Sequence, residues 1–196
     1  ESKLSDQGGD DVIVAGDGNN LIIAGMANDN VTSGTGVDII IGDSGEAIAD
    51  GVGLLREIRT TNLGDGGNDT IVAGSGGNTV LAGQGADNIT STTAAGTRDI
   101  LVGDNAEVFI SAANIVTSFE STDLSDATGG ADVILGSDAN TYALGGTGAD
   151  QITTGSGIDS ILGDHGKVTY NADGSLSKAE SKLSDQGGDD VIVAGD

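Results

Sequence analysis

Aliphatic residues recur every nine positions through most of the chain, each two residues after an Asp or Asn. In the first sixty residues these polar positions are Asp11, Asn20, Asp29 and Asp38. A three-residue strand turns its central side chain to one face, and such a lap buries its aliphatic only when laps stack. The pattern therefore predicts a solenoid of short strands. Its inner column is expected to hold Ile13, Ile22, Val31, Ile40, Ile71, Val80, Ile89, Leu101, Ile134, Ile152, Ile161 and Ile192.

Six residues remain in each lap for a turn, and glycine stands two residues before most of the polar positions, as at Gly9, Gly36 and Gly85. Glycine permits positive φ and close backbone approach. The outward neighbours of the inner column are also apolar in several laps. Because exposed apolar rows usually mark contacts, we expect hairpins or a neighbouring roll to cover them. These neighbours are Val12, Val14, Leu21, Ile23, Ile39, Ile41, Val133 and Leu135.

The first seventeen residues return unchanged as the last seventeen, so residues 1–17 and 180–196 match at every position. The chain spans one 179-residue block and the start of the next, which predicts head-to-tail continuation with copies of itself, as a covalent tandem array or a filament. Gly-Asp pairs at 42–43, 103–104 and 163–164 mark three diverged units within the block. The units are predicted at 1–62 (laps 6–45, hairpin 46–62), 63–123 (laps 64–106, hairpin 107–123) and 124–183 (laps 127–166, hairpin 167–183), with 184–196 opening the next block.

The segments between the sets of laps carry hairpin signals, with turns expected at residues 50–53, 111–114 and 171–174. A short amphipathic helix over Leu54–Arg59 is the alternative for the first of them. Four laps make two complete coils, so the hairpins should leave on one side of the roll. They would then form a continuous side sheet with Ile58, Phe119 and Ala179 on equivalent positions, whereas a fifth lap would place them on alternate sides.

The laps resemble the nonapeptide repeat of RTX proteins, G-G-x-G-x-D-x-U-x. The resemblance is carried by GTGVDIII at 34–41, GGNDTIV at 66–72, GQGADNIT at 83–90 and GGTGADQIT at 145–153. It implies an all-β, calcium-stabilised parallel β-roll with three inserted hairpins, holding several Ca²⁺ ions. The chain departs from the repeat at Asn20, Asn78 and Thr141, which replace the Asp, and at Ala143, which replaces the inward aliphatic.

Carboxylates at nine-residue spacing are suited to a hard cation, with turn carbonyls completing each shell. The alternative is that these residues only form turns. Ligands eighteen residues apart should lie on one side of the roll, as Asp11 with Asp29, Asn20 with Asp38, Asp69 with Asp87 and Asp132 with Asp150. The predicted metal-ligating residues are Asp11, Asn20, Asp29, Asp38, Asp69, Asn78, Asp87, Asp99, Asp132, Asp150, Asp159 and Asp190.

The formal charge is −24, and the chain has neither cysteine nor proline. The Asp columns would repel each other without a counter-ion, and the same charge argues against a nucleic-acid partner. No hydrophobic run approaches the length of a membrane span, so no membrane insertion is expected. Besides head-to-tail copies, neighbouring rolls in lateral contact are a further partner that the sequence allows.

These observations favour a structural calcium-binding segment of a giant secreted or cell-surface protein, such as a stalk, adhesin extender, fibre or surface layer, that folds on extracellular calcium. The alternative is the RTX secretion and folding module of a secreted enzyme such as a protease or lipase. Residues 42–45 spell the serine-protease motif GDSG, but Ser44, Asn105 and His165 share that slot, so the segment is not expected to be an enzyme. His165 is expected in an exposed turn.

Overall fold

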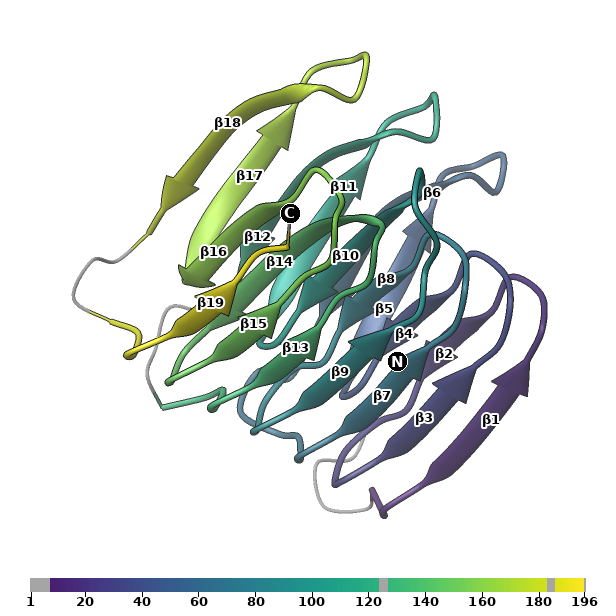
Figure 1. Ribbon diagram of the computed structural model, residues 1–196. Helices are drawn as coiled ribbons and strands as arrows, with labels where there is room; N and C mark the ends of the chain where they lie inside the picture. Colours follow the sequence, from purple (N-terminus) through teal and green to yellow (C-terminus); the bar gives the residue numbers. More distant parts are fainter. Residues whose placement is uncertain (1–7, 124–126, 183–185, 196) are drawn as a thin grey trace.

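The chain winds through successive coils, each of which crosses two parallel sheets in turn (Figure 1). The structure, a computed structural model, describes residues 8–123, 127–182 and 186–195. One strand of each coil lies in what we call the outer sheet and the other in the middle sheet, with turns between them. The described residues contain strands and no helix, which confirms the predicted all-β parallel roll.

Seven strands form the outer sheet and six form the middle sheet, all parallel to their neighbours. The outer sheet contains β1 (Val12–Gly16), β3 (Asn30–Ser33), β7 (Thr70–Ala73), β9 (Asn88–Ser91), β13 (Val133–Leu135), β15 (Gln151–Thr153) and β19 (Val191–Val193) in that order. The middle sheet contains β2 (Leu21–Ile23), β4 (Ile39–Ile41), β8 (Thr79–Leu81), β10 (Arg98–Val102), β14 (Asn140–Gly146) and β16 (Ser160–Asp164).

The facing sides of these two sheets enclose the predicted inner column. Val31, Ile40 and Ile89 are fully buried there, and Ala143 packs in the same cluster. Burial falls away at the ends of the roll: Ile13 is half-buried and Ile192 is 45% exposed. The reason is that β1 and β19 each have a strand on one side only. Stacking of coils, rather than any single lap, therefore makes the core.

Plain coils alternate with coils that carry a hairpin. Paired residues are 18 positions apart in the sequence from β1 to β3 and 40 positions apart from β3 to β7, where Val31 lies beside Ile71. The same alternation continues, with offsets of 18 and 45 and then 18 and 40. Two coils per hairpin is the spacing that four laps predict, so all three hairpins leave from the same side.

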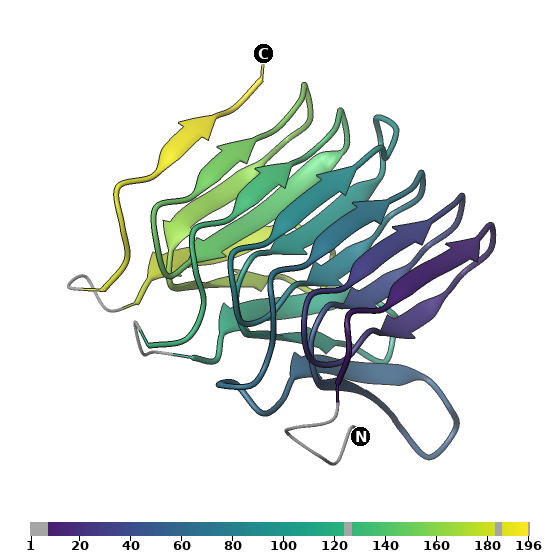
Figure 2. The same cartoon turned by 90° about the horizontal axis from the view of Figure 1, so that it is seen from below.

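The three hairpins join into one antiparallel sheet, which we call the hairpin sheet (Figure 2). Ala47, Ile58, Val108, Phe119, Val168 and Ala179 lie in a single cross-strand row, which confirms the predicted side sheet and its equivalent positions. The helix considered over Leu54–Arg59 is wrong, because that segment pairs as a strand in this sheet. The strands are β5 (Gly45–Ala49), β6 (Leu55–Thr60), β11 (Ala106–Ile110), β12 (Val116–Ser121), β17 (Gly166–Tyr170) and β18 (Leu176–Ser181).

The hairpin sheet packs on the face of the middle sheet that points away from the outer sheet, and the two sheets enclose a second core. Phe119 is fully buried there, and its ring stacks 6.4 Å from that of Tyr142 on β14. The hairpins thus cover Ile41 completely and Ile39 in part, as expected. On the outer sheet, the expected covering of the outward apolar residues is not found within this chain, since Val12 is 79% exposed. Of the other outward residues, Ile23 is partly covered, Val133 is half-buried, and Val14, Leu21 and Leu135 are exposed.

Candidate metal sites

The polar positions of the laps divide between two edges of the roll. At the hairpin edge, the chain passes from the middle sheet to the outer sheet, and the hairpins leave here. At the plain edge, it passes from the outer sheet to the middle sheet. The hairpin edge holds the predicted ligands Asp11, Asp29, Asp69, Asp87, Asp132, Asp150 and Asp190, each directly before an outer strand. The plain edge holds Asn20, Asp38, Asn78, Asp99 and Asp159, together with Thr141.

The Asp side chains of the hairpin edge form a continuous ladder from coil to coil. Oδ1 of Asp69 accepts a hydrogen bond of 2.8 Å from the backbone N–H of Asp29, and Asp87 accepts one of 2.6 Å from Asp69. Asp132 and Asp150 continue the ladder at 2.7 and 2.8 Å. Residues that are eighteen positions apart and were predicted to be neighbours, such as Asp69 and Asp87, therefore lie together. One carboxylate oxygen of each rung is used in holding the next coil.

The other oxygen of five rungs is buried without a hydrogen-bond partner among the described residues. This holds for Oδ2 of Asp29, Asp69, Asp87, Asp132 and Asp150, and none of these residues is more than 2% exposed. An ionised carboxylate oxygen in such a place is costly unless a positive charge or a donor meets it. A row of five such oxygens on one edge is an arrangement that a bound cation would satisfy.

Glycines opposite these oxygens leave the space that a cation needs. A Cβ atom added to Gly42 would strike Oδ2 of Asp69 and lie 2.5 Å from the carbonyl oxygen of Ala82. At Gly103 the same atom would strike Oδ2 of Asp132 and lie 2.9 Å from the carbonyl oxygen of Gly145. Each cradle therefore pairs a carboxylate oxygen with a carbonyl oxygen of the next coil. Carboxylate and carbonyl oxygens are the ligands that Ca²⁺ takes.

Burial and mutual repulsion raise the pKa values of these carboxyl groups. Burial raises the pKa of Asp87 to about 9 and, with the charges of Asp104 and Asp87 added, that of Asp132 to about 10. The pKa values of Asp69 and Asp150 rise to about 7, again mainly through burial. The ladder therefore resists full ionisation at neutral pH unless a cation offsets its charge.

Asp43, Asp104 and Asp164 also point into the hairpin edge, although the sequence reasoning treated them only as markers of the units. Asp43 is 2% exposed, and its carboxylate accepts hydrogen bonds from the backbone N–H groups of Gly67 at 3.0 Å and Gln84 at 2.6 Å. Burial and the charge of Asp69 raise its pKa to about 8. The Gly-Asp pair repeated directly before each hairpin is the sequence signal from which these residues could have been included in the site.

The plain edge is arranged differently, since amide and hydroxyl groups satisfy most of its polar positions. Nδ2 of Asn78 donates to the carbonyl oxygen of Gly74 at 2.8 Å. Oδ2 of Asp99 accepts from the hydroxyl of Ser91, and Oδ2 of Asp159 from the hydroxyl of Thr154, both at 2.6 Å. Asp38 is the exception, because its Oδ2 is buried and has no partner among the described residues.

The donor set suits calcium rather than a metal held by side chains alone. No group of three or more His, Cys, Asp or Glu side chains in the described part of the chain is placed to hold an ion. The cradles at Gly42, Gly103 and Gly145 instead combine Asp oxygens with backbone carbonyl oxygens. Ca²⁺ accepts this mixture and completes its shell with water, so the residues present fit calcium.

The slot shared by Ser44, Asn105 and His165 lies inside the structure. The expectation of an exposed turn at His165 is wrong, because its side chain is fully buried, with Nε2 3.4 Å from Oγ1 of Thr147. Ser44, the residue directly before β5, is fully buried as well. These positions therefore serve packing where each hairpin leaves the roll.

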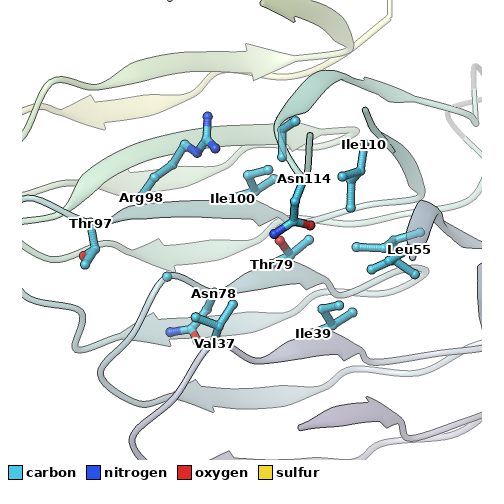
Figure 3. Close-up of a pocket in the computed structure, with 13 residues that line it drawn as sticks. Val37, Ile39, Leu55, Asn78, Thr79, Thr97, Arg98, Ile100, Ile110 and Asn114 are labelled. Atoms are coloured by element: carbon cyan, nitrogen blue, oxygen red, sulfur yellow. The ribbon is translucent and has the colours of Figure 1, made fainter. Parts of the chain in front are cut away.

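A separate cavity of about 380 Å³ lies between the middle sheet and the hairpin sheet (Figure 3). Its lining is mostly aliphatic, with Ile39, Leu55 and Ile100 among its walls. Arg98 is the one ionisable residue among the described residues that line it, and its guanidinium lies 5.6 Å from the ring centroid of Tyr142. The described lining therefore combines mostly aliphatic walls with a single guanidinium.

The described residues include no helix long and apolar enough to span a membrane.

Comparison with known proteins gives a family for the chain. No individual curated protein and no solved structure is significantly similar to the chain. The family model for the RTX calcium-binding nonapeptide repeat matches four times, at residues 6–40, 63–92, 126–161 and 144–167. These matches cover more than half of the sequence, and the chain belongs to the RTX calcium-binding nonapeptide repeat family.

Proposed function

We propose that the chain is a load-bearing segment of a larger secreted or cell-surface protein, a stalk or adhesin extender made of tandem copies. The observation that carries the proposal is the position of β19. Its residues repeat those of β1 one block later, and it lies in register as the seventh strand of the outer sheet, with Ile192 beside Ile152. The start of the next block thus continues the roll rather than ending it.

A further copy would extend both sheets without a change of register. Ile13 pairs with Val31 at the start of the roll. Ile192 holds the equivalent position one block later, so it could pair in the same way with the Val of the next coil. Six coils separate β1 from β19, and at the strand spacing of about 4.8 Å each block would add roughly 29 Å of length. The edge strands β5 and β18 would pair in the same way, which would close the open edges of the hairpin sheet.

Calcium would make the assembly depend on its surroundings. A metal that binds only the folded chain stabilises that chain by linkage. In a calcium-poor cytosol the repelling Asp ladder would disfavour folding, and export would deliver the chain to calcium. This coupling supports a structural module that folds outside the cell.

Small-angle X-ray scattering of chains with one, two and three copies of the block tests the proposal. In calcium, we expect the longest dimension to grow by about 29 Å per copy at constant cross-section. Copies that fold as separate domains on mobile linkers would give a cross-section and flexibility inconsistent with a rod. That result would exclude the continuous stalk while leaving calcium binding in place.

A further inference from the structure

We propose that calcium is bound along the hairpin edge alone, apart from one position at Asp38, and that Asp43, Asp104 and Asp164 are ligands there. The inference rests on the proposed calcium-dependent function and deepens it. It divides two edges that the nonapeptide pattern treats alike. The division follows from the groups that meet each buried oxygen.

On the plain edge, side-chain amide groups stand where an ion would have to bind. Nδ2 of Asn20 lies 2.9 Å from the carbonyl oxygen of Gly18, 3.3 Å from that of Gly16 and 2.9 Å from Oδ1 of Asp38. Two turn carbonyls and a carboxylate are a set of oxygens suited to calcium. Here an amide nitrogen already meets these three oxygens, so a cation has no place among them. Only the other oxygen of Asp38, Oδ2, lacks a partner among the described residues and is left for an ion.

The same principle repeats along that edge in alternate coils. Asn78 directs its amide nitrogen to the carbonyl oxygen of Gly74, and in the intervening coils the hydroxyls of Ser91 and Thr154 meet Asp99 and Asp159. Every second polar position is neutral, as Asn20, Asn78 or Thr141. The lap positions of this edge therefore carry three Asp residues against seven at the hairpin edge, and hydrogen bonds satisfy most of their charge.

On the hairpin edge, the ladder position is Asp in every coil, and five buried oxygens lack a donor among the described residues. At the site of the first hairpin, Oδ2 of Asp69 and the carbonyl oxygen of Ala82 both border Gly42. Oδ2 of Asp43 borders Gly83, the residue that follows Ala82. Asp43, Asp69 and the Ala82 carbonyl thus converge on one small region.

The position of Asp43 on the backbone explains why an acid is used there. Backbone hydrogen bonds align Gly25, Asp43, Gly83, Asp104, Gly146 and Asp164 from coil to coil. Glycine stands in the uninterrupted turns, and Asp stands where a hairpin breaks the turn and removes its local carbonyls. Both carboxylate oxygens of Asp43 and of Asp104 accept a backbone N–H, as does Oδ1 of Asp164, and each of these oxygens retains a lone pair. The Asp side chain therefore supplies the oxygen that the interrupted turn lacks.

The number of ions bound by the folded 196-residue chain tests the division of edges. Equilibrium dialysis against calcium should give six ions, five for the unpartnered oxygens of the hairpin edge and one at Asp38. Asp132→Asn should remove one ion, and the matched plain-edge variant Asp99→Asn should remove none. Asn78→Asp should add an ion. Twice the expected number in the parent chain, or loss of an ion in Asp99→Asn, would overturn the proposal.

Europium luminescence tests the role of the hairpin aspartates independently of folding. The lifetimes in H₂O and D₂O report how many water molecules remain on the bound ion. Asp104→Asn and Asp164→Asn should each raise the summed hydration by about one water and weaken one site about tenfold or more. Unchanged hydration would show that these residues only anchor the backbone. A parent chain that binds neither Ca²⁺ nor Eu³⁺ would instead refute the proposed function itself.

Discussion

Acid should replace calcium in folding this chain. In the absence of metal, burial raises the pKa values of Asp43, Asp87, Asp104 and Asp132 to between about 8 and 10 in the folded chain. In the unfolded chain they stay near the ordinary value of 3.8. The folded chain therefore binds more protons than the unfolded chain between pH 4 and pH 8. Stability in chelator is greatest below the unfolded pKa and is lost as pH rises through the folded values.

The magnitude follows from the number of carboxyl groups that stay protonated in the folded chain. Each contributes about 1.4 kcal/mol per pH unit while its unfolded form is ionised. Neighbouring rungs influence each other, so we count only two of the four groups, which gives about 2.8 kcal/mol per pH unit. From pH 7 to pH 5 the gain is roughly 5–6 kcal/mol, comparable to the whole stability of a small domain.

Far-UV circular dichroism of the chelated chain checks this expectation at pH values from 8 down to 5, above the isoelectric point of about 4.1. We expect β structure to appear on acidification without calcium. With calcium present the dependence reverses, because protons compete with the ion for the same oxygens. A β signal in chelator that stays constant, or that weakens between pH 7 and pH 5, would refute the reasoning about the buried ladder.

Three further outcomes follow from the packing and the cradles. Phe119→Ala should lower the unfolding free energy in calcium by about 3–5 kcal/mol in thermal or denaturant unfolding, whereas Phe109→Ala, half-buried on the other face of the hairpin sheet, should cost much less. Equal losses would argue against the second core. Gly103→Ala should place a methyl group against Asp132 and remove one bound calcium in dialysis, while Gly51→Ala, whose added Cβ has no neighbour within 4 Å, should bind the full number. Mg²⁺ at the same concentration should not restore folding, because it demands tight octahedral geometry and gives up water reluctantly; circular dichroism measures this, and full recovery in Mg²⁺ would count against calcium cradles.

The roll could be predicted from the sequence because its determinants are local and periodic. One aliphatic per nine residues fixes both the strand and the side it faces, as Ile40 and Ile89 illustrate. The hairpin sheet was also predictable, since two coils advance the roll by the width of one hairpin. The covering of Ile41 by that sheet followed from the same reasoning.

The difference in hydrogen bonding between the two edges could not be predicted, because it depends on contacts between coils. The nonapeptide pattern assigns the same role to Asp87 and Asp99, yet only Asp99 has a hydroxyl, that of Ser91, at its second oxygen. Asp43 was missed for a related reason, since its role arises where the hairpin separates it from Gly67 in the sequence. His165 was misplaced because its ring is buried beside Thr147, a contact between residues eighteen positions apart that forms only when the coils stack.

Hydrogen–deuterium exchange at neutral pH, with and without calcium, tests most directly whether the metal holds the roll together. The informative amides are those of Asp29, Asp69, Asp87 and Asp132, which donate to the next rung of the ladder. Protection of these amides and of the inner strands β8 and β9 should appear only with calcium. Equal protection in chelator at neutral pH would contradict the account.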